Sequence, residues 1–232
     1  MIKPTPSRRA VLRGGVLLGA SWIATLTACS TPDRASTAPS PTTPAPGPAE
    51  GTLASSTATR TLLAYFSRPG ENYYYGGRRD LEVGNTEVLA RMISELIECD
   101  VYRINAVEPY PRSYDATVER NVREQSADAR PAISNPLASI EQYDTVLLGS
   151  PIWNVRPPMI MTTFTESHDF TGKTVHPFVT YAVSGLGSTE RDYAASCRGA
   201  RIGEGFAIRG EEVQQHRFDL ETWLRAADLS TG

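Results

Sequence analysis

The residues of this chain with the clearest chemical potential lie in loops that follow short apolar runs. Ser67 comes directly after the run 61–66, and Gly84-Asn85-Thr86 opens a stretch with helical spacing. The first N–H groups of a helix are unpaired and carry partial positive charge, so with Ser and Thr hydroxyls they can hold a phosphate. An ordinary helix cap uses the same residue types. The tripeptide alone therefore leaves a phosphate site and a simple cap both open.

Aromatic side chains and small residues follow two later apolar runs. Trp153 follows one of them and Tyr181 ends the other. Large rigid rings supply flat apolar faces at little cost in entropy, which suits a planar aromatic ligand, although each ring alone is also consistent with a core or lid aromatic. The small residues are Ser184, Gly185 and Gly187, whose backbone allows close approach to a ring edge or simply forms a turn.

The elements that position these loops alternate along the chain. Five short apolar runs typical of buried strands are separated by stretches with helical spacing. The predicted strands are 61–66, 100–104, 144–149, 174–181 and 201–208, and the predicted helices are one that begins with Asn85 or Thr86 as its cap, then 114–129, 158–166, 189–196 and 211–227. Because parallel strands need crossover connections, this order predicts a doubly wound α/β fold with helices on both faces of the sheet. Its ligand site is expected outside the carboxyl ends of the strands.

Six stretches along the chain resemble the flavodoxin family, in particular its branch with a long insertion in the phosphate-binding loop. They are FSRPGENY (66–73), GNT (84–86), PIWNV (151–155), TFTE (163–166), DFTGKTVHPF (169–178) and SGLG (184–187). Their order along the chain makes the resemblance more specific than any single motif. The resemblance implies a five-stranded parallel sheet of order 2-1-3-4-5 and a bound FMN.

The resemblance also implies which residues of this chain hold FMN. They are Ser67, Arg68, Asn85, Thr86, Pro151, Ile152, Trp153, Asn154, Tyr181, Ser184, Gly185 and Gly187. The start of the first helix and the neighbouring hydroxyls would bind the phosphate. Trp153 would cover one face of the ring, and either Tyr181 or a tyrosine of the segment 73–75 would cover the other.

Two residues depart from the family pattern within the implied site. Asn154 stands where the family has a second Trp, and Val155 where it has Gly. A β-branched residue resists the backbone angles that Gly allows, and the family reorients a peptide of this loop when the flavin is reduced. These departures favour the alternative that the fold is retained as a binding module without FMN. Arg156, which follows, predicts a more positive field at the ring edge and hence a higher reduction potential.

The N-terminal segment predicts export and lipid attachment. Arg8 and Arg9 precede the apolar run 14–28, which resembles a twin-arginine signal peptide and is too short and too weakly apolar to span a bilayer. The sequence LTAC, which ends at Cys29, resembles a lipobox whose cysteine is acylated. We therefore expect a signal peptide at 1–28 and an extracytoplasmic location, with the lipid on Cys29 as the membrane anchor.

Composition separates a tether from a folded domain. Residues 29–59 are rich in Pro, Thr, Ser and Ala and are predicted to stay unfolded, whereas residues 60–232 are long enough for one domain with a substantial core. Four of the 23 basic residues and none of the 26 acidic residues fall in 1–28, which leaves the rest of the chain with a formal charge of −7. This acidic balance argues against nucleic acid as a partner.

The remaining reactive side chains offer no competing chemistry. Cys99 and Cys197 are predicted to be buried free thiols, with one disulfide between them as the alternative. His168, His176 and His216 lack the spacing of metal ligands or of a triad, and are predicted to lie at the surface or in loops.

Three functions are consistent with the sequence. The leading prediction is an FMN-dependent electron carrier that exchanges electrons with redox partner proteins or membrane quinones and does no bond chemistry of its own. The second is a flavin-dependent quinone reductase, which would need a nicotinamide donor. The third is the binding module without FMN. Whether the protein is an enzyme stays open at this point.

Overall fold

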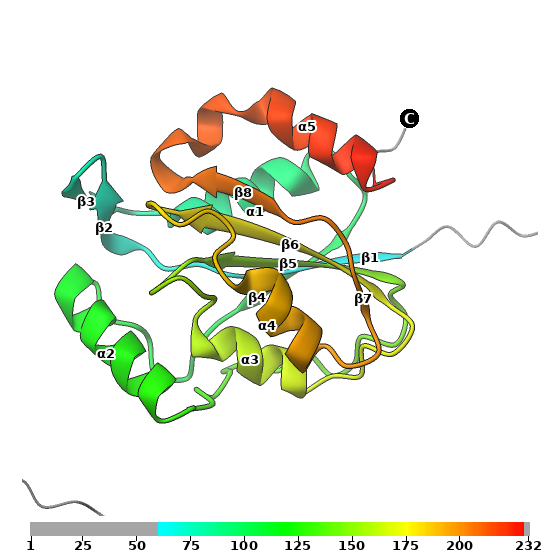
Figure 1. Ribbon diagram of the computed structural model, residues 1–232, viewed down its shortest axis with the longest axis horizontal. Coiled ribbons are helices and arrows are strands. Elements are labelled where there is room, and N and C mark those ends of the chain that lie inside the picture. The colour runs from blue at the N-terminus through cyan, green and yellow to red at the C-terminus, as the bar shows by residue number, and fades with distance from the viewer. Residues whose placement is uncertain (1–59, 230–232) are drawn as a thin grey trace, which may run out of the picture. The chain divides into compact units, whose positions relative to one another are not determined.

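The main sheet consists of the strands predicted from the apolar runs, and Figure 1 shows it between layers of helices. The structure is a computed structural model that describes residues 60–229, so the predicted signal peptide and tether lie outside the described residues. Its strands are β1 (Thr61–Phe66), β4 (Asp100–Ile104), β5 (Thr145–Pro151), β6 (Thr174–Tyr181), β7 (Arg201–Ile202) and β8 (Phe206–Arg209). All pairs are parallel, in the order β4-β1-β5-β6 with β7 and β8 both beside β6, which confirms the predicted order 2-1-3-4-5.

Helices cover both faces of this sheet (Figure 1). Helices α1 (Asn85–Ser94) and α5 (Arg217–Ala226) lie on one face, and α3 (Met159–Glu166) and α4 (Thr189–Ser196) lie on the other. Helix α2 (Tyr114–Ser126) extends past the sheet edge. None of the helices formed by residues 60–229 is long and apolar enough to cross a membrane. The doubly wound α/β architecture predicted from the alternation is confirmed.

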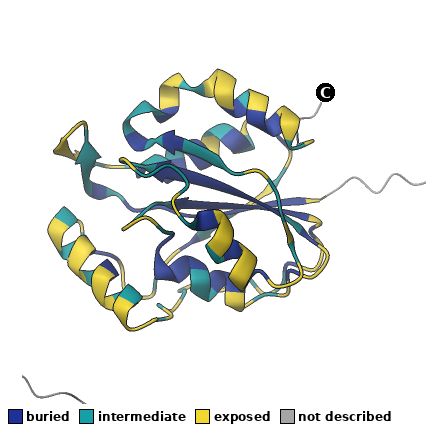
Figure 2. Ribbon diagram, in the orientation of Figure 1, coloured by how far each residue is buried: buried dark blue, intermediate teal, exposed yellow. Residues whose placement is uncertain are grey.

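Alternate residues of the central strands supply the two halves of the core. In β1, Leu62 packs in the cluster that includes Phe164 of α3, and Leu63 packs in the cluster that includes Leu89 of α1. Figure 2 shows the central strands buried along their length, because both faces are covered by helices. This double burial explains why these strands are continuous apolar runs in the sequence.

The last strand and the last helix differ from their predictions. The predicted strand 201–208 is divided into β7 and β8, because pairing with β6 is interrupted at residues 203–205, opposite His176 and Pro177. The predicted helix 211–227 is a 3-10 helix, η1 (Gly210–Gln215), followed by α5. Phe218, which the helical spacing places on the apolar side, is 74% exposed.

Two expectations about reactive side chains have different outcomes. Cys197 is buried and Cys99 is half-buried, and both are free thiols, as predicted in preference to a disulfide. The prediction that each histidine lies at the surface or in a loop is wrong for His176. This residue is buried in β6, where the alternation of the strand turns it toward Trp223, and burial lowers its pKa.

The insertion between β1 and α1 forms a β-hairpin that the sequence analysis did not anticipate. Strands β2 (Gly70–Tyr74) and β3 (Gly77–Leu81) pair antiparallel around a two-residue turn. The turn residues Tyr75 and Gly76 both have positive φ, 43° and 86°. A tyrosine in this conformation is uncommon, so the usual Asn-Gly signal for such a turn is missing from the sequence.

We expect Gly149→Ala to destabilise the fold strongly. A Cβ at this position in β5 would lie 2.1 Å from the Phe178 ring in the buried core, and overpacking of this kind costs about 1–3 kcal/mol. Urea unfolding followed by circular dichroism measures the change in free energy. Gly77→Ala is the matched control, because its Cβ would meet only ordinary contacts in the exposed hairpin. Equal stability of the two variants would contradict this packing.

Candidate functional site

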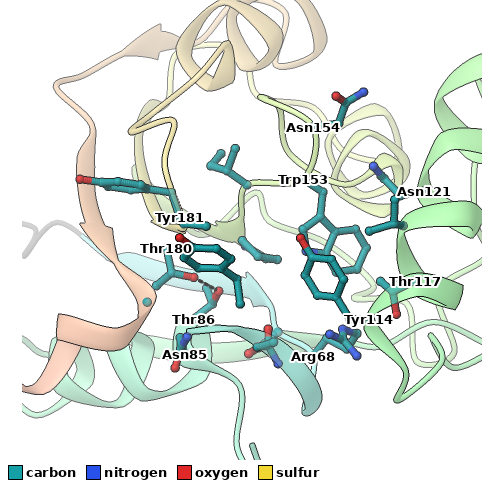
Figure 3. A pocket seen from close by; sticks show the side chains of 18 of the residues that line it. Arg68, Asn85, Thr86, Tyr114, Thr117, Asn121, Trp153, Asn154, Thr180 and Tyr181 are labelled. Atoms are coloured by element: carbon teal, nitrogen blue, oxygen red, sulfur yellow. Dashed lines mark hydrogen bonds between the residues drawn. The ribbon is translucent and has the colours of Figure 1, made fainter. Parts of the chain in front are cut away.

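A cavity opens at the carboxyl ends of β1, β5 and β6, next to the point where the strand order reverses (Figure 3). Its volume is about 300 Å³, within the range of small-molecule sites. Nine of the twelve residues that the resemblance implied line it: Ser67, Arg68, Asn85, Thr86, Pro151, Ile152, Trp153, Asn154 and Tyr181. Ser184, Gly185 and Gly187 do not line it. The edge of the sheet thus gathers most of the predicted residues around one space.

One end of the cavity is the N-terminus of α1. The backbone N–H groups of Asn85 and Thr86 have no acceptor among residues 60–229. Gly84 is the N-cap, so the prediction that Asn85 or Thr86 caps the helix is wrong. The capping side chain comes instead from another segment. The hydroxyl of Ser67, directly after β1, accepts the Glu87 N–H at 3.1 Å. The first turn therefore keeps two free N–H donors.

Hydroxyl groups extend this set of donors. The Thr86 hydroxyl lies 2.7 Å from that of Thr180, at the end of β6, and the two share a hydrogen bond (Figure 3). Thr180 was missed by the sequence analysis because it lies inside the predicted strand rather than in a loop. Gly210 closes this side of the cavity, and a Cβ there would lie 2.2 Å from the Asn85 side-chain nitrogen. A larger residue at this position would displace the Asn85 side chain.

Arg68 places a positive charge in the cavity wall without a direct ion pair to another described residue. The residue is 7% exposed, and it forms no ion pair within residues 60–229. Its Nη1 donates to the carbonyls of Pro111 and Arg112 at 2.8 and 3.0 Å, and its Nη2 donates to the carbonyl of Glu71. Its Nε is buried and has no partner in the described part of the chain. Burial lowers the pKa of the guanidinium, which stays charged, so an anion beside it would be stabilising.

One carboxylate also borders the cavity. The Glu211 side chain is 1% exposed, accepts the Tyr75 N–H at 3.4 Å and lies 3.8 Å from Nη1 of Arg209. Its charge is therefore paired, and its bond to Tyr75 holds the hairpin turn against η1. Residues 60–229 contain no cluster of three His, Cys, Asp or Glu side chains that could hold a metal ion.

Aromatic rings line other parts of the cavity. Trp153 packs edge-on against Phe66 and Tyr110, with ring centroids 5.6 and 5.2 Å apart, so it is both part of the core and part of the lining. Tyr181 lies on the β8 side of the opening in Figure 3. Of the three tyrosines in the insertion, only Tyr73 lines the cavity. The lining therefore combines rigid rings with the polar groups at the start of α1, as a site for a planar, phosphorylated ligand requires.

The segment 153–156 forms a two-residue turn, and its two central residues are Asn154 and Val155, which depart from the family pattern. The N–H of Trp153 donates to the carbonyl of Arg156 at 2.9 Å, and the reverse bond is 3.4 Å. Asn154 and Val155 have φ of 51° and 61°, so both residues are left-handed. Asparagine tolerates this conformation, but for a β-branched residue it is a true outlier that costs about 1–3 kcal/mol. Val155 thus occupies the conformation expected of the family's glycine.

The loop that follows β6 holds this strained turn in place. The backbone N–H and the hydroxyl of Ser188 both donate to the carbonyl of Val155, at 2.8 and 3.3 Å. A Cβ on Gly187 would lie 2.2 Å from the same carbonyl, so only glycine fits there. Gly187 therefore supports the turn instead of lining the cavity. Arg156 lies 3.3 Å from Asp192 and does not line the cavity, so the positive field expected from it is offset.

Helix α2 forms a wall of the cavity that the sequence analysis missed. Its contribution to the lining consists of Tyr114, Thr117, Val118, Asn121 and Val122. Figure 2 shows the helix mostly exposed or half-buried, and its two buried residues, Thr117 and Asn121, are polar. Apolar periodicity therefore gave no signal that one face of this helix points inward. The only available signal was the thin apolar stripe.

The hairpin and α2 are held together by charged groups. Arg78 of β3 forms two hydrogen bonds with the carboxylate of Asp115, at 2.8 and 2.7 Å, and its guanidinium lies over the Tyr114 ring. Glu71 of β2 accepts the N–H of Tyr114 at 3.0 Å, which satisfies a donor in the first turn of α2. These contacts make the hairpin and α2 one connected wall.

Comparisons with known proteins find a matching family and solved structures that share the fold. The family described as Flavodoxin matches residues 81–227. A putative flavoprotein of Bacteroides uniformis is 30% identical with a TM-score of 0.58, over 72% of this chain and 98% of its own. A putative flavoprotein of Bacteroides eggerthii is 26% identical with a TM-score of 0.58, over 75% and 100%. A Lactobacillus acidophilus flavoprotein in complex with FMN, 20% identical over 68% and 98%, shares the fold with a TM-score of 0.50. A comparison with the curated proteins finds no match.

We expect Val155→Gly to stabilise the protein by about 1 kcal/mol, because glycine adopts positive φ without the steric cost that valine incurs. Val183→Gly is the matched control, since Val183 is also an exposed loop valine but its φ is not positive. That variant should lose about 0.5–1 kcal/mol through the added freedom of the unfolded chain. Urea unfolding measures both. If Val155→Gly loses as much stability as the control, the turn is not strained.

Proposed function

Because the chain belongs to the flavodoxin family, we propose that it is an FMN-binding electron carrier held by a lipid at the outer face of the cell membrane. One observation carries the proposal: the cavity that combines a buried, unpaired guanidinium and a free helix N-terminus with aromatic rings. A phosphate needs the first set of groups, and an isoalloxazine ring needs the second.

The residues present fit FMN. The N–H groups of Asn85 and Thr86 would bind the phosphate, with Arg68 supplying the compensating charge. Trp153 would border the ring, with Tyr73 or Tyr181 on its other side. When bound, FMN supplies the electron-transfer chemistry, while the protein positions it and sets its potential. The Lactobacillus flavoprotein, which has the same fold and was solved with FMN, supports this assignment.

The composition of the cavity favours an electron carrier over an enzyme. Among residues 60–229, its lining contains no His, Cys or Lys, and its one carboxylate, that of Glu211, already lies 3.8 Å from Nη1 of Arg209. The electron partners would be redox proteins or membrane quinones. A flavin-dependent quinone reductase would use the same cavity but would also need a nicotinamide donor.

The N-terminal sequence supports the proposed location. A twin-arginine signal at 1–28 would export the domain already folded, so FMN would be loaded before export. Cys29 would then carry the lipid, and residues 29–59 would act as a tether between the lipid and the domain.

A binding module without FMN remains the second candidate, because Asn154 lies in the wall of the cavity and Val155 lies next to it in the same turn. The strained turn is the observation that favours it. The two candidates differ in a single property, the visible absorbance of bound flavin.

We expect the purified protein to bind FMN, with visible absorbance and quenched flavin fluorescence, and to bind riboflavin at least about 100-fold more weakly. Riboflavin lacks the phosphate, and charge-assisted hydrogen bonds contribute about 1.5–3 kcal/mol each. Fluorescence titration of the apoprotein measures both dissociation constants. Absence of FMN binding at micromolar concentration would support the binding module. Equal affinities for FMN and riboflavin would contradict a phosphate site at the start of α1.

We expect the pair of changes Thr86→Val and Thr180→Val to weaken FMN about tenfold and to leave riboflavin binding unchanged. The two hydroxyls satisfy each other, so replacing both with groups of the same shape should leave the free energy of unfolding nearly unchanged while it removes donors from the phosphate end. An equal loss of both ligands would mean that these hydroxyls contribute to the shape of the cavity rather than to phosphate binding.

We expect Cys29→Ser to move the protein from the membrane fraction to the soluble extracytoplasmic fraction, because serine cannot receive the lipid. Cell fractionation with immunoblotting measures this. Cys99→Ser is the control, since that thiol lies in the folded domain and is half-buried. Retention of Cys29→Ser in the membrane fraction would contradict the lipid anchor.

A further inference from the structure

Three side-chain amides form a chain from the strained turn to helix α2. The Nδ2 of Asn154 donates to Oε1 of Gln125 at 2.9 Å. The Nε2 of Gln125 donates to the backbone carbonyl of Trp153 at 3.2 Å and to Oδ1 of Asn121 at 3.3 Å. These hydrogen bonds connect helix α2 to the turn. A tryptophan at position 154, as in the family pattern, has no side-chain amide to take part in them.

The direction of this chain is fixed by the Trp153 carbonyl. A backbone carbonyl only accepts, so the Gln125 atom beside it is the nitrogen, and the opposite end of that amide is the oxygen. Asn154 must therefore present its nitrogen to Gln125, and Asn121 must present its oxygen. The nitrogen of Asn121 is left as the free donor at the end of the chain.

This free donor lies in the cavity wall. Asn121 is 3% exposed and lines the cavity, and its Nδ2 donates to no residue within 60–229. Figure 3 shows its side chain projecting from α2 toward the side of the cavity where Trp153 lies. The Nδ2 atom is not among the buried side-chain atoms of residues 60–229 that lack a partner, so it is open to the cavity and available to an acceptor that arrives with a ligand.

The neighbours of Asn121 limit what the acceptor is. Val118 lies three residues before Asn121 and Val122 one residue after it. Both valines are partly exposed and line the same cavity, as does Trp153. No ionised side chain comes from this wall, so it suits a neutral planar group that carries a carbonyl on its edge rather than a phosphate. The charged groups of the site, Arg68 and Glu211, come from other segments.

We propose that the Asn121 amide donates a hydrogen bond to a carbonyl oxygen of the pyrimidine edge of FMN, and that Gln125 and Asn154 are positioning residues that hold Asn121 in this orientation. This inference rests on the proposed function, because it requires that the cavity binds FMN. It also assigns a role to Asn154, the residue that departs from the family pattern.

The hydrogen bond affects the reduction potential as well as binding. Two-electron reduction at neutral pH adds two electrons and one proton, and the resulting negative charge spreads onto the pyrimidine carbonyls. A hydrogen bond to a charged acceptor is about twice as strong as one to a neutral acceptor. The Asn121 donor therefore stabilises the reduced form more than the oxidised form and raises the midpoint potential.

The test compares Asn121→Leu, Asn121→Asp and a control with the wild type. We expect Asn121→Leu to weaken oxidised FMN about fivefold and reduced FMN about fiftyfold. This tenfold difference corresponds to a fall of about 30 mV in the two-electron midpoint potential. Asn121→Asp is nearly isosteric and places an acceptor where the donor was, so the midpoint should fall further. Ser126→Leu, on an exposed position of the same helix, should change neither quantity.

Fluorescence titration gives the affinity for oxidised FMN, and equilibration with redox dyes gives the midpoint potential. Urea unfolding of the apoproteins measures the structural contribution of Asn121, because Asn121→Leu also removes the Oδ1 acceptor of Gln125, whereas Asn121→Asp keeps an oxygen at that position. FMN binding by the wild type with an unchanged midpoint in both Asn121 variants overturns the inference but leaves the proposed function intact. Failure of the wild type to bind FMN overturns both.

Discussion

The guanidinium of Arg68 joins three segments that lie far apart in the chain or outside the main sheet: the end of β1, the segment before α2, and the hairpin. From the end of β1 it donates to the carbonyls of Pro111 and Arg112, before α2, and to that of Glu71 in β2. Gly70, with φ of 100°, permits this approach, since a Cβ there would lie 2.6 Å from the Arg112 carbonyl oxygen. This buried cation therefore helps to hold the hairpin and the segment before α2 over the sheet edge, together with the contacts of Arg78 and Glu71 to α2.

The same cation gives the cavity its charge, so scaffold and ligand chemistry are linked. The buried guanidinium donates only to backbone carbonyls and forms no direct ion pair within residues 60–229, and the adjacent N-terminus of α1 adds further positive potential. The opposite side of the cavity is held differently, by the strained turn at Asn154 and Val155, which the loop after β6 and the amides of α2 keep in place. Ligand binding at either end would stabilise the walls that form it.

The fold could be predicted from the sequence because its strands are buried on both faces. The strands at 61–66, 100–104 and 174–181 agree with the structure to the residue. The site was predicted only in part, because the loops of the main sheet carry recognisable motifs whereas α2 turns Thr117 and Asn121 inward, residues that read as surface positions. The acceptor role of Ser67 at Glu87 depends on tertiary contact across twenty residues, which no local pattern encodes.

A crystal structure of the protein with FMN tests the central claim most directly. The account predicts that the phosphate lies within hydrogen-bond distance of the N–H groups of Asn85 and Thr86, on the Arg68 side of the cavity, with the ring beside Trp153. Three results would contradict it: a phosphate that points into solvent, a flavin ring that lies outside this cavity, or an empty cavity in crystals saturated with FMN.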